Sequence, residues 1–419
     1  MNLAESTLST RAMLERARAA APKLAELSTA DKNALLTRLA DSIDAGTETI
    51  LAANQKDMDA SQRNPEMEES MRDRLLLTRE RVAAMAAGVR AVALLPDPVG
   101  EVLAEWQRPN GLRIRKVRVP LGVIGIIYEA RPNVTVDTVA LALKTGNAIV
   151  LRGSKEAANS NQCLVQILAV VEGLPEGAIQ LLDSTNRDSV RELIEARGLV
   201  DVIIPRGGTG LISFVVENSL VPVIETGAGN CHIYVDETAD LDMADAIVIN
   251  AKTQRPSVCN AAEKLLIHES IAATYIPRIA AKLLEHGVEL RGDATACKLA
   301  AKIQPATDAD WGEEYLRLCL AIRVVSGLEP AIAHINRYST QHSEAIVTQD
   351  EARARHFLRA VDSAAVYWNA STRFSDGAEF GFGAEMGIST QKLHCRGPFA
   401  LAELTSSKYE VLGSGQIRN

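Results

Sequence analysis

The stretch VIGIIYEARPNVTVDTVALALKTGNAIVLRGSK, residues 123–155, decides the fold. It begins with the apolar run Val123–Tyr128, continues with a helical pattern over 134–144 and ends with a second apolar run, Ala148–Leu151. Short apolar runs rich in Val and Ile are typical of strands that are buried on both faces. Two such strands joined by a helix predict a parallel sheet in an α/β fold.

The same alternation continues toward the C-terminus. Three further apolar runs, Ala178–Leu182, Val200–Ile204 and Val221–Ile224, are separated by helical stretches at 160–172 and 188–196. A second α/β series follows, with segments at 246–250, 264–267, 272–286 (a helix), 323–325, 332–336, 343–348 and 366–369. We therefore expect two α/β domains, each with a Rossmann-type parallel sheet.

The chain before this stretch is predicted to be helical. From Leu3 to about Leu95, Ala, Leu, Glu and Arg dominate, and apolar residues recur at helical spacing. Ser28 and Thr78, each followed closely by an acidic residue, are typical of helix starts. The prolines and the glycine of residues 96–100 are expected to end this region.

Two segments alternate apolar and polar residues without a core of their own. Leu112–Val119 is one, and Asn110-Gly111 just before it is a strong hairpin-turn signal. The tail from Phe399 to Ile417 contains the other. Exposed edge strands are normally paired or covered. We therefore expect a small flap that joins copies of the chain.

Composition excludes several classes of protein. The 419 residues are 47% hydrophobic and 23% charged, as in an ordinary globular protein. The net charge of −8 argues against a nucleic-acid binder. The longest apolar stretch reaches only about half of the roughly 18 residues that a membrane span needs. The charged N-terminus does not look like a secretory signal, so we expect a cytoplasmic protein.

The 6 cysteines are expected to be free thiols, because none forms a CxxC pair. Histidines and cysteines also lack the spacing of metal ligands, so no metal is expected. One cysteine stands out. Cys259 lies in the turn that begins with Arg255 and Pro256, ahead of an apolar segment. A turn of this kind can present a thiolate to a pocket near helix-type amide donors.

Two further segments carry groups suited to catalysis. Glu225 ends an apolar run and precedes Gly227 and Gly229, which allow the backbone to turn sharply. It is either a catalytic carboxylate at a strand end or a solvated turn acid. Asn133 follows the apolar run 123–128. It is either the N-cap of the helix 134–144 or an amide donor to a developing oxyanion.

Two segments are suited to phosphates. Arg152, Ser154 and Lys155 place cations and a hydroxyl after a predicted strand. Arg206, Gly207 and Gly208 begin a glycine-rich turn that could admit a pyrophosphate near a helix start. The second segment lacks the GxGxxG spacing.

The order of these segments resembles the aldehyde dehydrogenase superfamily over nearly the whole chain. Glu313-Glu314 is similar to its acidic ribose-binding stretch, although the usual Phe-Gly-Pro is missing, and Arg152 stands where a lysine is usual. These departures point to one branch. The strings YEARPNVT (128–135), AIAHINRYSTQHSEAI (331–346), GFGAEMGIST (381–390) and HCRGP (394–398) resemble the γ-glutamyl phosphate reductase family.

The resemblance implies a reaction. Members reduce L-glutamyl 5-phosphate with NADPH to glutamate 5-semialdehyde and phosphate, through a cysteine thioester, in proline biosynthesis. It implies Cys259 as nucleophile, Asn133 as oxyanion donor and Glu225 as a proton-handling group. It implies cofactor contacts by Arg152, Ser154, Lys155, Arg206, Gly207, Gly208 and Glu314. For the substrate phosphate, the loops beside these segments offer Arg131, Arg255, Ser257 and Arg396.

The resemblance also implies an organisation and partners. We expect a cofactor-binding domain at 1–107 and 121–227, a catalytic domain at 228–390, and an oligomerisation hairpin and tail at 108–120 and 391–419. The expected assembly is a homodimer or homotetramer, with glutamate 5-kinase as a possible partner. Two alternatives stay open: an NAD(P)-dependent aldehyde dehydrogenase that forms a carboxylic acid, and a non-catalytic partner of the kinase.

Overall fold

The computed structural model describes residues 8–65, 67 and 69–418. The chain divides into two compact units. The first comprises the chain up to Glu225 with 382–387 and the segment from Phe399, and the second comprises 226–381 and 388–398. The predicted domain boundary after 227 is therefore close to the observed division. The start of the predicted helical region, residues 3–7, lies outside the described residues.

The first unit contains the parallel sheet that the sequence predicts. Its strands are β3 (Val123–Tyr128), β4 (Ala148–Arg152), β5 (Ile179–Leu181) and β6 (Val202–Arg206), in the order β5-β4-β3-β6. The strand predicted at 221–224 is wrong, because this segment forms only an isolated bridge between Ile203 and Val223. Pro222 has no backbone N–H to donate, so a regular ladder cannot continue there.

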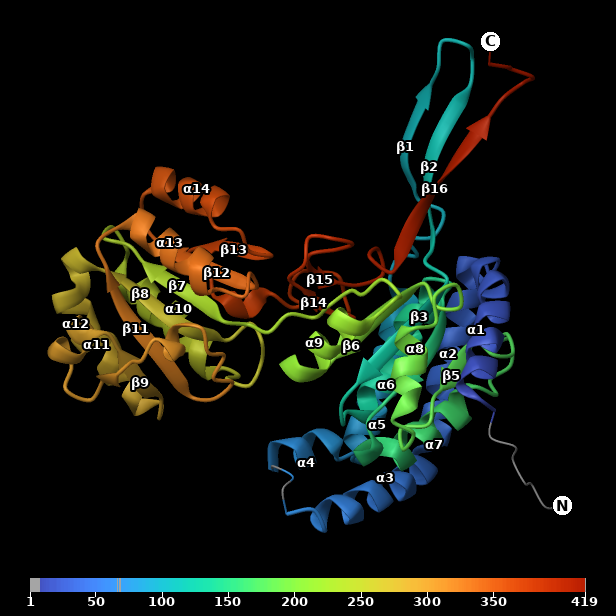
Figure 1. The fold of residues 1–419 in the computed structure, drawn as a ribbon, viewed down its shortest axis with the longest axis horizontal. Helices are drawn as coiled ribbons and strands as arrows, with labels where there is room; N and C mark the ends of the chain where they lie inside the picture. Colours follow the sequence, from blue (N-terminus) through green and yellow to red (C-terminus); the bar gives the residue numbers. More distant parts are fainter. Residues whose placement is uncertain (1–7, 66, 68, 419) are drawn as a thin grey trace. The chain divides into compact units, whose positions relative to one another are not determined.

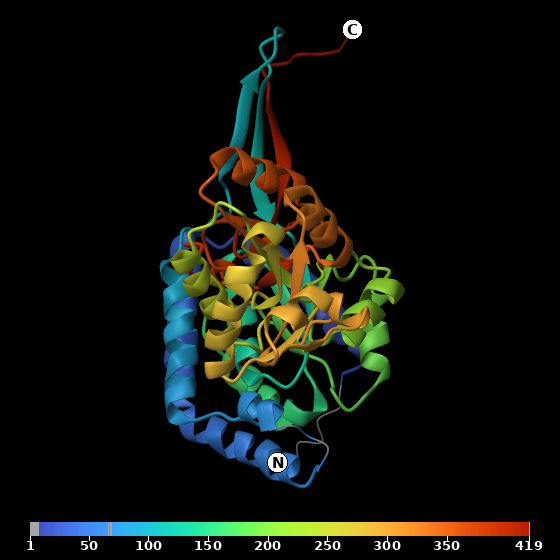
Figure 2. The same ribbon diagram turned by 90° about the vertical axis from the view of Figure 1, so that its left-hand side faces the viewer.

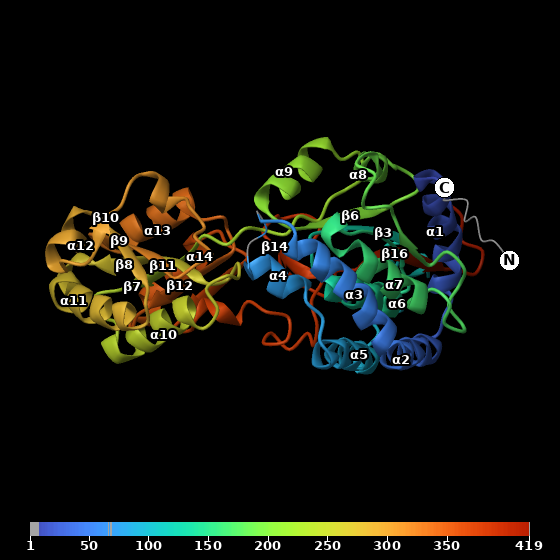
Figure 3. The same ribbon diagram turned by 90° about the horizontal axis from the view of Figure 1, so that it is seen from below.

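Helices cover both faces of this sheet (Figure 3). α1 (Thr10–Ala25) and α8 (Asp188–Ile194) lie together on one face. α6 (Pro132–Lys144) and α7 (Ala158–Leu168) pack on the other face, and α2 (Thr29–Ala45), α3 (Thr47–Gln62) and α5 (Arg79–Leu94) form a layer outside them. α4 (Glu69–Leu75) and α9 (Thr209–Asn218) complete the described helices of this unit.

The predicted helix starts are confirmed. The Ser28 side chain accepts from the Asp31 amide, and the Asp31 side chain accepts from the Ser28 amide, which is a complete capping box. The Thr78 side chain accepts from the Arg81 amide. Each cap pairs amide groups that the first turn of a helix would leave unbonded.

The flap is a three-stranded antiparallel sheet in the order β1-β2-β16. β2 (Arg113–Pro120) ends one residue beyond the first alternating segment, β16 (Thr405–Leu412) lies within the second, and the turn at Asn110-Gly111 is confirmed. β1 (Val102–Gln107) lies before residue 108, where the predicted hairpin begins. All six of its residues are exposed, so its sequence does not show the apolar pattern of a buried strand. The three strands run side by side away from the helical layers of this unit (Figures 1 and 2).

The second unit contains a seven-stranded sheet in the order β10-β9-β11-β8-β7-β12-β13. Its strands are β7 (Cys231–Val235), β8 (Ala262–His268), β9 (Glu289–Gly292), β10 (Gln304–Pro305), β11 (Cys319–Val325), β12 (Ser343–Val347) and β13 (Ala365–Trp368). All their described pairings are parallel. β14 (Gly387–Ser389) and β15 (Gly397–Phe399) pair with each other. The sequence patterns missed β7, whose polar His232 interrupts the apolar run although all five residues are buried.

Helices sandwich this sheet as well. α10 (Leu241–Thr253), α11 (Glu269–Glu285) and α12 (Ala294–Leu299) pack on one face, and α13 (Leu328–Tyr338) and α14 (Glu351–Ala360) pack on the other. Along β8, Leu265 and Ile267 join the first core and Leu266 joins the second. The segments 246–250 and 332–336 belong to α10 and α13. No helix in the described part of the chain is long and apolar enough to cross a membrane.

Candidate active site

The first unit gathers several predicted site residues at the carboxyl edge of its sheet. The chain runs from β3 to β4 and β5 on one side and returns to β6 on the other side of β3. Ligands of open α/β sheets bind at such a switch point. Glu129 and Asn133 follow β3, and Arg206 ends β6. The sheet therefore brings the asparagine loop and the glycine turn to the same crevice edge.

Asn133 does not cap the helix that follows. α6 begins at Pro132 with Arg131 as its N-cap residue, and no side chain accepts a capping hydrogen bond there. Asn133 is exposed within the first turn, where its Nδ2 donates to Asp137 Oδ2 at 3.0 Å. Burial raises the pKa of Asp137, while the Asn133 hydrogen bond and Arg206 lower it. The N-cap interpretation is wrong because the helix starts earlier than the pattern 134–144 indicates.

The glycine turn already holds a carboxylate. The Gly208 amide donates to Glu129 Oε1 at 2.7 Å. A Cβ at Gly207 would lie 2.7 Å from Glu129 Cδ, so a larger residue here would require the Glu129 carboxylate to move. Gly208 is the N-cap residue of α9. Its amide therefore binds an anion, but the anion in this structure is Glu129.

The segment after β4 offers a different environment. The Arg152 guanidinium is half-buried and donates to the carbonyl oxygens of Ser184 and Asn186 at 3.3 and 3.4 Å. Burial lowers the pKa of Arg152. Lys155 is exposed, and the hydroxyl of Ser154 is buried without a hydrogen-bond partner within the described residues. An unpartnered buried hydroxyl next to an exposed cation fits a polar anionic ligand such as the phosphate-bearing part of a dinucleotide.

Cys259 lies in the loop between α10 and β8 and is half-buried. The element that follows is a strand, so helix-type amides do not surround the thiol as the sequence analysis expected. The next residue fixes the loop. Asn260 Nδ2 donates to the Ser375 carbonyl at 2.9 Å, and Thr372 Oγ1 donates to the Asn260 carbonyl at 2.7 Å.

The loop 226–230 packs backbone against backbone on Cys259. A Cβ at Gly229 would lie 1.3 Å from the Cys259 carbonyl oxygen, so no other residue fits at this position. Cys231 Sγ donates to the same carbonyl at 3.2 Å. Gly229, which the sequence predicts as a turn residue, thus also packs closely against the main chain of Cys259.

The loop 226–230 is itself tied down at its end. Asn230 Nδ2 donates to the carbonyl oxygens of Trp311 and Tyr338, each at 2.8 Å, and the Asn230 amide donates to Thr340 Oγ1 at 2.9 Å. Tyr338 and Thr340 belong to the string 331–346 that carries the family resemblance. The string therefore anchors the loop that packs on Cys259.

Glu314 is part of the same arrangement. Its Oε1 accepts the Gly229 amide at 2.6 Å, and the side chain is half-buried. Burial raises the pKa of Glu314, and the Gly229 amide lowers it. Glu225 is half-buried just before this loop, and the amide of Ile224 donates to the Ile203 carbonyl of β6 at 2.9 Å.

The structure adds a cation that sequence reasoning missed. Arg373 lies in the short helix Thr372–Phe374, whose backbone holds Asn260, and its Nε donates to Gln254 Oε1 at 2.9 Å. Burial and the charge of Arg255 lower the pKa of Arg373, and Cys259 raises it. The Arg373 carbonyl accepts from Asn260 Nδ2 at 3.3 Å, so Arg373 lies beside the residue that follows Cys259. Its separation from Cys259 in the sequence left no local signal to find it.

The other predicted phosphate ligands have different surroundings. Ser257, Arg255 and Arg131 are exposed. Arg396 donates to Asp362 Oδ1 at 2.7 Å and to the Asp362 carbonyl at 2.9 Å, so its guanidinium is engaged in an ion pair.

A buried histidine and a buried glutamate face each other from the neighbouring strands β7 and β12 of the second unit. His232 Nδ1 is 3.1 Å from Glu344 Oε2, and both side chains are fully buried. Burial lowers the pKa of His232 to about 3 and raises the pKa of Glu344 to about 8. Among the described residues, no three His, Cys, Asp or Glu side chains are grouped so that they could hold a metal ion.

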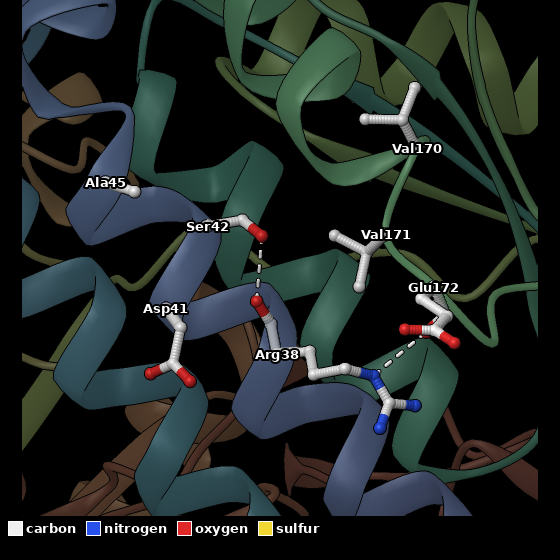
Figure 4. A pocket seen from close by; sticks show the side chains of 7 residues that line it. All are labelled: Arg38, Asp41, Ser42, Ala45, Val170, Val171 and Glu172. Carbon is white, nitrogen blue, oxygen red and sulfur yellow. Dashed lines mark hydrogen bonds between the residues drawn. The ribbon is translucent and has the colours of Figure 1, made fainter.

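A hollow of about 410 Å³ elsewhere on the first unit contains none of the predicted site residues. It lies between α2 and the segment after α7 (Figure 4). Arg38 Nε crosses it to donate to the Glu172 carbonyl at 2.9 Å. The other lining residues are Asp41, Ser42, Ala45, Val170 and Val171.

The fold and the cysteine loop define a class of protein. The model of the aldehyde dehydrogenase family matches residues 4–310, and the chain belongs to that family. A γ-glutamyl phosphate reductase from Koribacter versatilis is 71% identical over 98% of this chain and 100% of its own length. The one from Moorella thermoacetica is 58% identical over 96% of this chain and 97% of its own.

A solved structure is also similar. The crystal structure of γ-glutamyl phosphate reductase from Thermotoga maritima has a TM-score of 0.96 at 48% identity, and the match covers 98% of this chain and 100% of that one. Within the aldehyde dehydrogenases, the chain belongs to the γ-glutamyl phosphate reductase family.

Proposed function

We propose that this protein reduces L-glutamyl 5-phosphate with NADPH to glutamate 5-semialdehyde and phosphate, the second step of proline biosynthesis. The observation that carries the proposal is the half-buried thiol of Cys259 in a loop that carries Arg255 and that is bound, through Asn260, by the short helix of Arg373. Nearby cations favour the thiolate, which is the nucleophilic form of cysteine. The same cations suit a substrate whose leaving group is a phosphate.

The first step is attack of Cys259 Sγ on the acyl carbon of the substrate. The new S–C bond replaces the C–O bond to phosphate, and the phosphate leaves with that electron pair. The positive charges of Arg255 and Arg373 would stabilise the negative charge that develops on the leaving phosphate. The Cys259 backbone N–H donates to the tetrahedral oxyanion, and the resemblance gives Asn133 the role of a second donor.

The thioester is then reduced to the aldehyde. NADPH supplies the hydride, and collapse of the thiohemiacetal returns the electron pair to Cys259 Sγ. Water would divert the thioester to the acid, so we propose that Glu225 manages protons during collapse instead of activating water. Ser257 and Arg131 remain candidate substrate contacts, and Arg396 would first have to leave Asp362.

The test of this function is the reverse reaction. The purified protein is given glutamate semialdehyde, in equilibrium with its cyclic form, and NADP⁺, and the absorbance of NADPH is followed with and without phosphate. A strict requirement for phosphate supports the proposal. Acid formation without phosphate indicates an ordinary aldehyde dehydrogenase, and no turnover under either condition indicates a non-catalytic protein.

We propose that Ser154 and Lys155 hold the 2′-phosphate of NADPH, because an exposed ammonium and an unpartnered hydroxyl lie side by side in sequence after β4. Arg152 is bonded to the 184–189 loop and is a weaker candidate. Arg206, Gly207 and Gly208 stay candidates for the pyrophosphate, since an amide that binds the Glu129 carboxylate also suits a phosphate oxygen.

Lys155→Ala is expected to raise the KM for NADPH about tenfold and to leave the KM for NADH nearly unchanged, since it removes a phosphate-binding charge. Steady-state kinetics with both cofactors measure this. Lys302→Ala, which removes an exposed lysine from the second unit, is the matched control. Equal changes for the two cofactors would contradict a 2′-phosphate contact.

We further propose a homo-oligomer that forms through the flap. The edge strands β1 and β16 leave Trp106 and Tyr409 partly exposed, with their rings 6.1 Å apart. Apolar groups on an open sheet edge are normally covered. The partner we propose is a second copy of the chain, and a glutamate 5-kinase remains a further candidate partner.

Ending the chain after Ser406 removes most of β16 and is expected to convert the oligomer to monomers. Light scattering coupled to gel filtration measures the mass, and circular dichroism confirms that the truncated protein is folded. An unchanged mass would show that the flap is not the interface.

A further inference from the structure

We infer that Glu314 is a positioning residue for Cys259: its carboxylate holds the Gly229 backbone, and the Gly229 backbone fixes the nucleophile's segment. The inference rests on the proposed function, in which Cys259 attacks the substrate. It adds to the ribose contact that the family resemblance implies a role that needs no cofactor.

The two contacts follow each other directly. Glu314 Oε1 accepts the Gly229 amide at 2.6 Å. Gly229 Cα lies so close to Cys259 that an added Cβ would be 1.3 Å from the carbonyl oxygen and 2.7 Å from Cα of that residue. A close backbone contact of this kind transmits displacement, because there is no space to absorb it. A shift of Gly229 would therefore move Cys259.

Glu314 is itself fixed to the strand that follows Cys259. Lys264 Nζ donates to the carbonyl of Glu313 at 2.7 Å, and the Leu316 amide donates to Glu263 Oε1 at 3.2 Å. Lys264 and Glu263 are neighbours on β8. Glu313, just before Glu314, and Leu316, two residues after it, are thus tied to β8, which starts at Ala262.

These links close a ring. It runs from Cys259 into β8, across to the 313–316 segment, through the Glu314 carboxylate to Gly229, and back to Cys259. Because each link in this ring is a hydrogen bond, a close contact or the chain itself, the ring holds the main chain of Cys259 in one place without using the cofactor. Precise placement of a nucleophile matters, since a displacement of about 1 Å can cost about 100-fold in rate.

The role that we infer for residue 314 requires a hydrogen-bond acceptor at the distance of Glu314 Oε1 from the main chain, and it does not require a negative charge. Oε1 is the oxygen that bonds the Gly229 amide. Glutamine keeps an oxygen at this reach and loses the charge, whereas aspartate keeps the charge and is one methylene shorter. The two substitutions therefore separate positioning from electrostatics.

The test measures alkylation of Cys259 by iodoacetamide without cofactor or substrate, with the modified residue identified by peptide mass spectrometry. We expect Glu314→Asp and Glu314→Ala to change the alkylation rate at least about fivefold and to lower kcat at least about tenfold. Glu314→Gln is expected to keep the alkylation rate within about twofold of the wild type, because it keeps the hydrogen bond to the Gly229 amide.

Glu285→Ala is the matched control, because Glu285 is an exposed glutamate at the end of α11, outside the cysteine loop and the 313–316 segment. It is expected to behave as the wild type. Wild-type alkylation and kcat in Glu314→Asp overturn the inference, as does an impaired Glu314→Gln beside a normal Glu314→Asp. A raised KM for NADPH with normal cofactor-free alkylation indicates a ribose contact and also overturns it.

Failure of the proposed function would look different. In that case Cys259→Ser would keep its turnover, whatever the Glu314 variants do. If Glu314→Ala does not fold, the Asp and Gln variants still decide between the outcomes.

Discussion

Cys259→Ser is expected to lower turnover by several orders of magnitude while the fold and NADPH binding stay near normal. The change is almost isosteric, but a hydroxyl is far from ionised at neutral pH without a strong base. The thioester then cannot form. Turnover is measured by the phosphate-dependent assay, folding by circular dichroism, and cofactor binding by fluorescence titration.

The wild type should also show one fast-reacting thiol toward iodoacetamide, protected by substrate. Cys297→Ser is the control, because Cys297 is a half-buried thiol whose pKa burial raises, so it is expected to be slow to alkylate and dispensable. If Cys259→Ser keeps more than about one hundredth of wild-type turnover, the covalent mechanism is wrong.

Gly229→Ala is the second substitution with a large expected effect. Its Cβ would lie 1.3 Å from the carbonyl oxygen and 2.3 Å from the carbonyl carbon of Cys259, which are main-chain atoms that cannot rotate away. The two segments must separate, and Cys259 moves with its loop. We expect kcat to fall at least about 100-fold, because a displacement of about 1 Å has that effect on a positioned nucleophile.

Gly88→Ala serves as the matched control. Gly88 lies in α5 with no neighbouring atom within 4 Å of the added Cβ, so this change is expected to keep full activity. It should raise the free energy of unfolding by about 0.5–1 kcal/mol, since alanine favours helices over glycine. Thermal unfolding and kcat measure both effects. Wild-type kcat in Gly229→Ala would show that the tight contact does not position the thiol.

The fold was largely predictable from local patterns. Val123–Tyr128 forms β3 with the predicted bounds. A strand that is buried on both faces requires a continuous apolar run, and this run is visible in the sequence itself. The caps at Ser28 and Thr78 and the turn at Asn110-Gly111 were predictable for a similar reason. Their hydrogen bonds join residues that are close in the sequence, so the local sequence is sufficient to predict these caps and this turn.

The wrong predictions concern segments in which strand pairing, and not the apolar pattern of the sequence, decides whether a strand forms. The run 221–224 is apolar, yet Pro222 interrupts its ladder, and it forms only a bridge. β7 contains His232 and was missed, although the Glu344 carboxylate accepts from its amide and lies 3.1 Å from its Nδ1 within the core. A buried histidine is tolerated when a partner from another strand satisfies it, and sequence patterns do not show that partner.

The sequence by itself determined the class of fold, the family and the cysteine to which the mechanism is assigned, because strand periodicity and motif order are encoded locally. The tertiary structure decided how the site is held. It set Glu129 on the Gly208 amide, Glu314 on the Gly229 amide and Arg373 beside the loop segment that contains Cys259. These partners are 79, 85 and 114 residues apart in the chain, by their numbers. Contacts at such separations depend on how strands and loops pack, and a local pattern does not contain that information.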